Sequence, residues 1–346
     1  MSIENLAAGS KAFALPLTMK FRATKIRQGL VFEGTDGWGE FAPFDNYDDQ
    51  ISGRWLAGSL EQAFTQWPDP IRSSVPINAI IPAVDPTAAA ALTFRAVVES
   101  GMTTLKVKVA EPGQSVEEDL ARLEAIRLQL SDLGVADVNI RIDVNGGWTA
   151  NEAISLINKY EIAAGGLDYV EQPCASLAEC AQVKKETSVR IAVDEGLRLA
   201  KLIDPAALRN SADVLVVKSI PMGGVQKSLA AINEVGLPVV VSGSLDTSIG
   251  LASGLQLAAS VSDLAGACGL GTGLLFEKDL VTSPLIPRDG QIYVAKPIPD
   301  TALLAEANNA VSVTEQKAWA ERMIRSWYAS AVKLVSPEVK QAVEAW

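Results

Sequence analysis

A repeated alternation of two patterns, between about residues 75 and 272, constrains the fold more than any other feature of the sequence. Short apolar segments rich in β-branched residues alternate there with amphipathic helical segments. The strand candidates are 76–81, 104–109, 138–144, 167–171, 190–193, 214–218, 238–242 and 265–269. Strands that alternate with helices form parallel βα units, and this series predicts an α/β fold of the (β/α)8 TIM-barrel type.

Residues outside this alternation predict a smaller α+β domain that caps the barrel. The N-terminal part contains short strand-like segments at 12–22, 29–33 and 38–42, followed by a helical stretch at about 50–64. The last residues, from about Val313, form a helical tail to which the sequence assigns no role. We therefore expect an α+β capping domain at 1–85, the barrel at 86–280, and a C-terminal return to the cap with the helical tail at 281–346.

The chain contains no histidine, which removes the commonest general base and the commonest zinc ligand. A Ser-His-Asp or Cys-His mechanism is thereby excluded. Any acid–base chemistry must use carboxylates, lysines, tyrosines or a metal-bound water.

Charge and cysteine content exclude several further classes. A net charge of −11 and a pI of about 4.7 disfavour binding to nucleic acid or to an anionic membrane. Three cysteines without a C-x-x-C pair argue against a disulfide framework or a structural zinc site. The first residues lack the pattern of a signal peptide, so a cytoplasmic enzyme is expected. The oligomeric state stays open, with a monomer favoured.

One stretch, 249–276, is apolar enough to suggest a membrane span, because its single charged residue is Asp263. Its glycines and polar residues instead predict a buried helix and strand of the barrel.

Acidic residues follow three consecutive predicted strands, at Asp143, Glu171 and Asp194. A TIM-type barrel builds its active site at these strand ends, so the three carboxylates should point into one cavity. Carboxylates that lie close together repel one another unless a cation compensates them, and oxygen ligands suit Mg²⁺. Each acid alone could be a solvated loop charge or a helix cap, but three in register favour a magnesium site.

Lysines stand at two further strand ends. Lys106 and Lys108 alternate with Val107 and so face the same side of their strand. Lys218 ends the sixth predicted strand and would reach the cavity from the opposite wall. A buried lysine near other cations has a lowered pKa and can act as a base near neutral pH. The alternative is that these lysines form structural ion pairs.

Together, these strand-end motifs resemble the muconate-lactonizing branch of the enolase superfamily. The motifs that carry the resemblance are K-x-K at 106–108, D-x-N at 143–145, E-Q-P at 171–173, D-E at 194–195 and Lys218. Within that branch, the runs at 75–84, 103–115, 140–148 and 169–175 look most like the actinobacterial o-succinylbenzoate synthases. The resemblance implies a modified (β/α)7β barrel beneath an α+β cap, with a bound Mg²⁺ and a small-molecule carboxylate substrate.

The resemblance also implies the catalytic roles. Asp143, Glu171 and Asp194 would bind Mg²⁺. Lys108 would remove the proton α to the substrate carboxylate, which Mg²⁺ stabilises in this superfamily, and would then protonate the departing hydroxyl. Lys218 would stay protonated on the opposite face of the substrate.

Supporting roles follow from the same resemblance. Lys106 would tune its neighbouring lysine, and Asn145 and Glu195 would support the metal ligands. Ser242 and Gly269 would contact the succinyl part of the substrate. Two cap loops, at 20–22 and 44–47, are expected to contact the substrate as well.

The implied reaction is the syn dehydration of 2-succinyl-6-hydroxy-2,4-cyclohexadiene-1-carboxylate to 2-succinylbenzoate in menaquinone biosynthesis. An N-acylamino acid racemase or dipeptide epimerase, with Lys108 and Lys218 as two bases, is the alternative on the same scaffold. A non-catalytic barrel would lack a ligand or a lysine, and none is lacking. The chain departs from the expected pattern at Asp246, where we expect glutamate, and at Gly271 and Thr272 in the last strand region.

Overall fold

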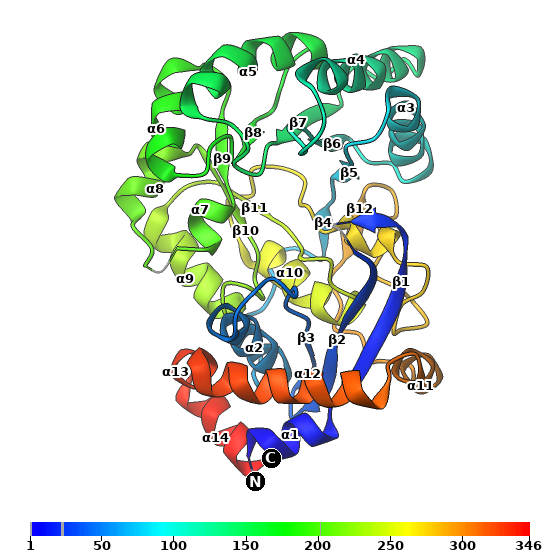
Figure 1. Cartoon of the computed structure of the whole chain (residues 1–346), viewed down its shortest axis with the longest axis vertical. Coiled ribbons are helices and arrows are strands. Elements are labelled where there is room, and N and C mark those ends of the chain that lie inside the picture. The colour runs from blue at the N-terminus through cyan, green and yellow to red at the C-terminus, as the bar shows by residue number, and fades with distance from the viewer. Residues whose placement is uncertain (1, 22–23, 201) are drawn as a thin grey trace.

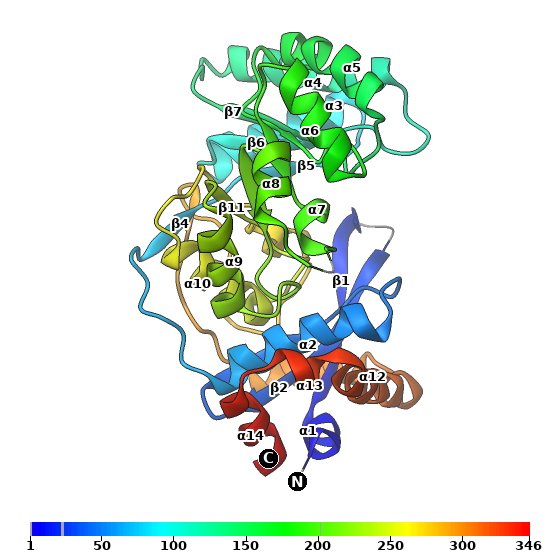
Figure 2. The same cartoon turned by 90° about the vertical axis from the view of Figure 1, so that its left-hand side faces the viewer.

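The computed structural model describes residues 2–21, 24–200 and 202–346. Figure 1 shows a parallel sheet with its covering helices in the upper part of the molecule and antiparallel strands with further helices in the lower part. The lower part is made by both ends of the chain, which lie side by side (Figures 1 and 2). The predicted combination of an α/β barrel-type sheet and an α+β cap is confirmed.

The cap begins with a three-stranded antiparallel sheet in the order β1-β2-β3. Its strands are β1 Lys11–Phe21, β2 Thr24–Gly34 and β3 Gly37–Phe41. Gly34 pairs with Gly37 across a tight turn, and Gly37 has a φ of 137°, which favours glycine. Helix α2, Asp49–Phe64, follows and begins at Asp48, whose carboxylate accepts a hydrogen bond from the Ile51 N–H at 2.8 Å.

The remaining cap helices come from the two ends of the chain. They are α1 Ile3–Gly9, α11 Thr301–Asn309, α12 Val313–Ser326, α13 Val332–Leu334 and α14 Pro337–Ala345, with a π-helical turn at Trp327–Ala331. Figure 2 shows α12 and α13 lying against α2. The apolar side chains of Trp55, Leu56 and Leu60 on α2 are buried against Trp319, Met323 and Trp327 of this tail. The tail therefore completes the core of the cap.

The catalytic part contains a seven-stranded sheet in the order β11-β10-β9-β8-β7-β6-β5, with every neighbouring pair parallel. The strands are β5 Ala79–Ile81, β6 Thr104–Lys108, β7 Asn139–Asp143, β8 Val170–Glu171, β9 Ile191–Val193, β10 Val214–Val217 and β11 Val239–Val241. The intervening helices are α3 Pro86–Phe94, α4 Val116–Asp132, α5 Ala150–Ala164, α6 Leu177–Glu186, α7 Glu195–Arg198, α8 Pro205–Ser211, α9 Val225–Val235 and α10 Ser248–Ser260. Both predicted capping boxes are present, at the starts of α4 and α5.

The predicted eighth strand, 265–269, forms isolated bridges instead of a regular strand. Gly269 donates its N–H to the Val241 carbonyl at 2.8 Å on one edge of the sheet, and Cys268 donates to the Pro76 carbonyl at 2.7 Å near the other. Gly266 in this segment has a φ of 120°, which a regular strand does not allow. The segment nevertheless links both edges of the curled sheet.

The predicted first strand, 76–81, is divided in two. Its beginning belongs to β4, Ser74–Pro76, which pairs antiparallel with β12, Gln291–Tyr293. Its end forms β5 in the parallel sheet. Pro76 has no backbone N–H, so it cannot donate to a continuous ladder.

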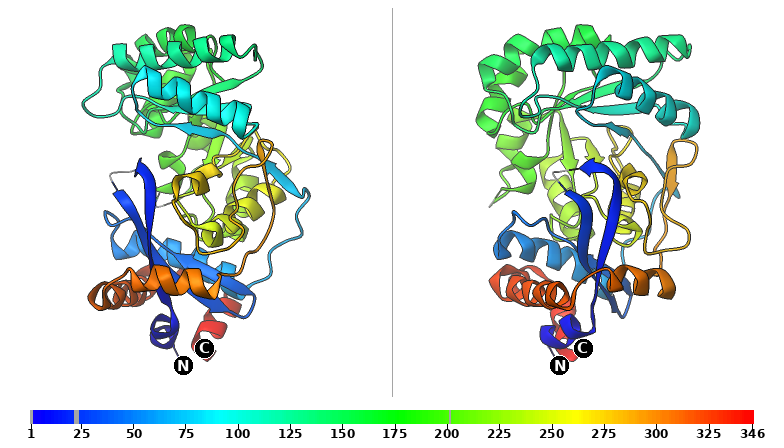
Figure 3. Two further views of the ribbon diagram at one scale, coloured as in Figure 1. Left: turned by 90° about the vertical axis from the view of Figure 1, so that its right-hand side faces the viewer. Right: turned by 45° about the vertical axis from the view of Figure 1, so that its right-hand side comes forward.

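The cap and the barrel-type sheet share buried surface. Figure 3 shows the β1–β2 hairpin extending from the cap towards the parallel sheet. Phe13 of β1 and Val31 of β2 are buried in one cluster with Leu245 and with Ile249 of α10. Helix α10 is buried along nearly its whole length, which explains the apolar stretch seen in the sequence. No helix of the described chain is long and apolar enough to cross a membrane.

Candidate active site

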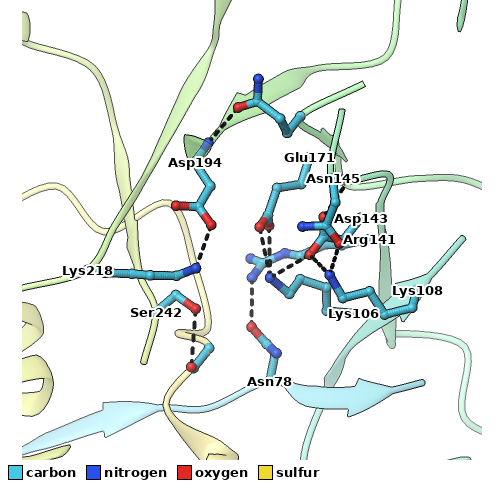
Figure 4. A network of polar contacts seen from close by, with 12 residues as sticks. Asn78, Lys106, Lys108, Arg141, Asp143, Asn145, Glu171, Asp194, Lys218 and Ser242 are labelled. Atoms are coloured by element: carbon cyan, nitrogen blue, oxygen red, sulfur yellow. Dashed lines mark hydrogen bonds and ion pairs between the residues drawn. The ribbon is translucent and has the colours of Figure 1, made fainter. Parts of the chain in front are cut away.

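The strand ends bring the predicted polar residues to one edge of the sheet. Lys108 at the end of β6 pairs in register with Asp143 at the end of β7, and Asp143 pairs with Glu171 at the end of β8. Asp194, Lys218 and Ser242 directly follow β9, β10 and β11. In Figure 4, Lys218 lies on one side of the acidic residues, and Lys106 and Lys108 lie on the opposite side.

The three acidic side chains are almost completely buried, with Asp143 2% exposed and Glu171 and Asp194 each 1% exposed. Each is held by cationic side chains. Lys106 Nζ lies 2.9 Å from Glu171 Oε1 and 3.3 Å from Asp143 Oδ2, so it bridges two of the acids. Lys218 Nζ lies 2.5 Å from Asp194 Oδ2.

Burial and charge shift the pKa values of these acids in different directions. Burial raises the pKa of Glu171 to about 7, with the neighbouring Asp143 and Asp194 carboxylates adding to the rise and Lys106 opposing it. For Asp143 and Asp194, burial acts in the same direction, but adjacent cations outweigh it and hold both pKa values well below the usual range. Glu171 is therefore the acid whose negative charge is compensated least.

The two lysines of β6 differ in accessibility. The Lys106 side chain is 9% exposed and the Lys108 side chain is 21% exposed. Burial would lower the pKa of Lys106, but Glu171 and Asp143 raise it above its usual value, so this ammonium stays charged. Lys108 Nζ lies 2.7 Å from Asp143 Oδ2 and also donates to the Asn145 side-chain oxygen.

The supporting residues named from the sequence lie around these groups. Asn145 has a φ of 49°, and its backbone N–H donates to Asp143 Oδ1 at 3.1 Å. Its side-chain amide donates to Glu195 Oε1 at 3.5 Å, and Glu195 Oε2 is buried without a hydrogen-bond partner. These contacts link the ends of β7 and β9.

The two residues expected to contact substrate lie next to each other. The Ser242 hydroxyl donates to the Gly269 carbonyl at 3.4 Å. A Cβ atom on Gly269 would lie 2.8 Å from Ser242 Oγ, so the close approach of the two segments requires glycine.

The cap loops differ in what is described. Arg22 lies outside the described residues, as do the side chains of Lys20 and Phe21. The second loop is described, and Tyr47 in this loop accepts a hydrogen bond from Arg198 Nη1 at 2.9 Å.

A buried polar contact joins the cap to the loop after β11. Glu40 of β3 accepts hydrogen bonds from Thr247 N–H at 3.2 Å and Gly250 N–H at 2.9 Å, at the start of α10. Burial and the nearby Asp246 raise the pKa of Glu40 to about 8. Arg27 of β2 donates to the Leu245 carbonyl at 2.9 Å. The cap thus fixes the segment that contains the departure from the family pattern at Asp246.

Sequence reasoning missed several arginines that support the site. Arg198 Nε donates to Asp194 Oδ1 at 3.0 Å, and Arg122 Nη1 donates to the Lys108 carbonyl at 3.0 Å. Arg141 lies two residues before Asp143, and its Nη1 donates to the Ala267 carbonyl at 2.6 Å. The spacing of Arg198, four residues after Asp194 on a helix, was a usable signal. Arg122 carried none that separates it from a solvated helix residue.

The donor set suits a hard divalent cation. Three buried carboxylates on neighbouring strands supply oxygen ligands, and the raised pKa of Glu171 marks negative charge that its neighbours do not fully offset. Within residues 2–21, 24–200 and 202–346, no three acidic or cysteine side chains stand close enough together to enclose a metal ion. The acids instead contact Lys106, Lys108, Lys218 and Arg198 (Figure 4).

Comparison with known proteins agrees with this geometry. The family model described as Enolase C-terminal domain-like matches residues 88–299, and Enolase N-terminal domain-like matches residues 12–63. A protein of Thermobifida fusca named o-succinylbenzoate synthase is 44% identical over 90% of this chain and 94% of its own length. A protein of the same name from Mycobacterium tuberculosis is 40% identical over 92% of this chain and 91% of its own.

Solved structures show the same fold at low sequence identity. A muconate lactonizing enzyme from Pseudomonas fluorescens aligns with a TM-score of 0.72 and 18% identity over 86% of this chain and 97% of that one. The L-Ala-D/L-Glu epimerase from Bacillus subtilis aligns with a TM-score of 0.70 and 21% identity over 84% of this chain and 96% of that one. The capped parallel sheet with acids and lysines at its strand ends defines a class of barrel enzyme. The chain belongs to the enolase superfamily and, within it, to the family of the o-succinylbenzoate synthases.

Proposed function

We propose that this chain is an o-succinylbenzoate synthase that dehydrates 2-succinyl-6-hydroxy-2,4-cyclohexadiene-1-carboxylate to 2-succinylbenzoate, a step of menaquinone biosynthesis. The relatives of this name, at 40–44% identity over about nine-tenths of the chain, support the assignment. The observation that carries it is the position of Lys108, a partly exposed lysine beside three buried carboxylates, with Lys218 on the opposite side (Figure 4).

Mg²⁺ is the proposed cofactor, held by Asp143, Glu171 and Asp194. When bound, it would supply positive charge beside the substrate carboxylate as negative charge develops there. The carboxylates require a cation of this kind because their burial makes uncompensated charge costly. The lysines that now contact them would then be available to the substrate.

Lys108 is the proposed base and acid of the reaction. As the neutral amine, it takes the proton from the ring carbon that bears the carboxylate, and that C–H bond breaks. The C–O bond on the neighbouring ring carbon then breaks, and Lys108 returns its proton to the departing hydroxyl, so that water leaves. The new C=C bond completes the aromatic ring. Both transfers occur on one face of the ring, which a single lysine can serve.

Lys218 is proposed to act through its charge. It lies on the other side of the acidic residues, and its ammonium would stabilise the negative charge that forms on the substrate after proton removal. Ser242 and Gly269, which lie beside each other beyond Lys218, are proposed to contact the succinyl group.

The test is direct turnover of the cyclohexadiene carboxylate by the purified chain. Product formation, followed by absorbance and mass spectrometry, should require added Mg²⁺ after removal of metal by a chelator, and Lys108→Ala should abolish it. Absence of turnover with Mg²⁺ would overturn the synthase assignment. Full turnover in excess chelator would overturn the metal assignment alone.

A second candidate, an N-acylamino acid racemase or dipeptide epimerase, is favoured by one observation: lysines lie on both sides of the carboxylates. A racemase needs a proton donor and acceptor on each face, whereas the dehydration needs them on one. In deuterium oxide, N-succinyl amino acids of either hand should exchange their α-proton slowly or not at all. Rapid exchange of both enantiomers without dehydration would favour the racemase.

A further inference from the structure

Arg198, on α7, joins the metal-site carboxylates to the cap. Its Nε donates to Asp194 Oδ1 at 3.0 Å, its Nη2 donates to Glu195 Oε1 at 2.9 Å, and its Nη1 donates to the Tyr47 hydroxyl at 2.9 Å. The side chain is 5% exposed, so these contacts replace water as partners of its guanidinium. A planar guanidinium holds several acceptors in fixed directions, which makes Arg198 a rigid connection.

Tyr47 lies in the loop of residues 43–48, which we call the cap loop. Its ring packs against Phe44 and Trp55, with ring centres 6.1 Å away in each case. Trp55 belongs to α2 and is 2% exposed. Arg54 of α2 adds a second connection to the barrel, because its Nη1 donates to the Arg198 carbonyl at 3.1 Å. The cap loop is therefore fixed between α2 and α7.

Arg322, on the C-terminal helix α12, holds the same loop from its other side. Its Nη2 donates to the Phe44 carbonyl at 2.7 Å and to the Tyr47 carbonyl at 3.1 Å, and its Nη1 donates to the Pro43 carbonyl at 3.2 Å. The side chain is 12% exposed. Three carbonyls of one short loop thus converge on one guanidinium, which no other described contact of α12 repeats.

We propose that Arg322 and Arg198 are positioning residues that hold the cap loop and the Asp194 carboxylate in one fixed arrangement, so that the C-terminal tail takes part in substrate and metal binding. The contacts form a continuous series from α12 through the Tyr47 backbone and hydroxyl to Arg198 and Asp194. This inference rests on the proposed function, because Asp194 matters in this way as a metal ligand. It gives the helical tail a role that the sequence did not suggest.

The two ends of this series should affect different measurements. Arg198 orients a proposed ligand, so a change there should weaken metal binding, as loss of supporting contacts around a ligand generally does by about 10–100-fold. Arg322 orients a loop at the substrate side, so a change there should raise KM more than it lowers kcat. A residue that merely stabilises the fold would move neither at a temperature where the protein stays folded.

Tyr47→Phe tests the connection to the metal site, because it removes one hydroxyl and keeps the ring packing against Phe44 and Trp55. Titration of the metal-free protein with Mn²⁺ alone, followed by calorimetry, should show a Kd raised by about 3- to 10-fold. An unchanged Kd would overturn the proposed link between the cap loop and Asp194.

Arg322→Ala tests the C-terminal helix, with Arg325→Ala as its matched control. Arg325 lies on the same helix, is mostly exposed, and pairs with Asp49 at 2.9 Å, outside the cap loop. Arg322→Ala should raise KM by about tenfold with kcat changed less than threefold, and amides of residues 43–48 should exchange with solvent faster. Arg322→Lys should recover part of KM, because an ammonium can replace one of the three contacts. Equal behaviour of Arg322→Ala and Arg325→Ala would overturn the role of Arg322.

The double variant Tyr47→Phe/Arg322→Ala distinguishes a connected series from two separate effects. Groups that act through one another are non-additive, so the second change should weaken Mn²⁺ binding less when the first is present. Simple additivity would reject the series. Failure of the proposed function is separate: it would appear as a wild-type protein that binds no Mn²⁺ and turns over no substrate, whatever the variants do.

Discussion

Lysines at the strand ends hold the buried acids in place, and this arrangement makes the charge balance of the site depend on single residues. Lys106 contacts both Glu171 and Asp143, so its removal leaves two buried carboxylates with fewer cations. Breaking a buried ion pair by deleting one partner costs about 3–5 kcal/mol, because the other charge stays buried and uncompensated.

Lys106→Met should therefore lower the thermal stability of the metal-free protein strongly, and Mg²⁺ should recover part of the loss, since a bound cation replaces the missing charge. Thermal unfolding with chelator and with excess Mg²⁺ provides the measurement. Lys317→Met, which removes an exposed lysine 3.9 Å from Glu321, is the control and should change little. Equal losses with and without Mg²⁺ would contradict the charge argument.

Lys108 is the strand-end lysine that chemistry should need more than folding does. Its side chain is more exposed than that of Lys106, and its contacts are at the mouth of the site. Lys108→Ala should be inactive while keeping the circular dichroism spectrum and nearly the melting temperature of the wild type. A misfolded variant would instead support a purely structural ion-pair role.

The sequence was informative at the residues that carry strand-end charge and uninformative at those that position them. Asp143, Glu171 and Lys218 follow apolar strands, so their setting made them conspicuous. Arg322 and Arg122 lie on amphipathic helices, where arginine is ordinarily solvated, and their contacts to loop carbonyls depend on tertiary packing. No local pattern distinguishes these two cases.

At the level of elements, the regular alternation of strands and helices was predictable wherever a strand has a continuous apolar run. The segment 214–218 became β10 almost unchanged, because four consecutive apolar residues are buried there. Segment 265–269 did not become a strand, since Gly266 takes a conformation outside the strand region. Strand β8 is two residues long although a longer segment was expected, because pairing is limited to Val170 and Glu171.

Helix starts in the barrel are capped by acids that come from the cap, and this arrangement predicts a pH dependence. Glu61 of α2 accepts from the Val225 N–H at 2.7 Å, at the first residue of α9. Burial raises the pKa of Glu61 to about 7 from an ordinary 4.5, although the two backbone N–H groups of Val225 and Gln226 lower it.

Because the folded state binds this proton more tightly than the unfolded state, the free energy of unfolding should fall as pH rises from about 4.5 to 7, by at most about 1.4 kcal/mol per pH unit for one proton. Glu61→Gln keeps an acceptor for the N–H groups and removes the charge. Its stability relative to the wild type should therefore improve between pH 5 and pH 8 in urea unfolding. Glu124→Gln, at an exposed position of α4, is the control, and parallel pH curves for the wild type and Glu61→Gln would contradict the prediction.

Across the whole molecule, the cap is made from both chain ends, and its contacts with the barrel are buried. Ile220, just after β10, lies in one apolar cluster with α2 and the C-terminal tail, and Ile249 of α10 lies in another with the β1–β2 hairpin. Glu40 and Glu61 add polar contacts from the cap to the starts of α10 and α9. The alternation of strands and helices predicted the barrel, but it could not show this sharing, because the contacts join residues far apart in the sequence.

This sharing predicts that residues 86–280 do not form a stable barrel alone. Without the cap, Ile220, Leu245 and Ile249 would lose apolar neighbours, and two helix starts would lose the acids that cap them. The isolated segment should show helical circular dichroism but no sharp thermal transition, whereas the full chain should unfold in one transition that is the same by far-ultraviolet dichroism and tryptophan fluorescence. Adding the separately produced segment 1–85 should restore little, because the tail at 313–346 supplies the other half of the cap core. A segment 86–280 that melts sharply within a few degrees of the full chain would show instead that the barrel carries its own stability and that the cap contributes mainly to the site.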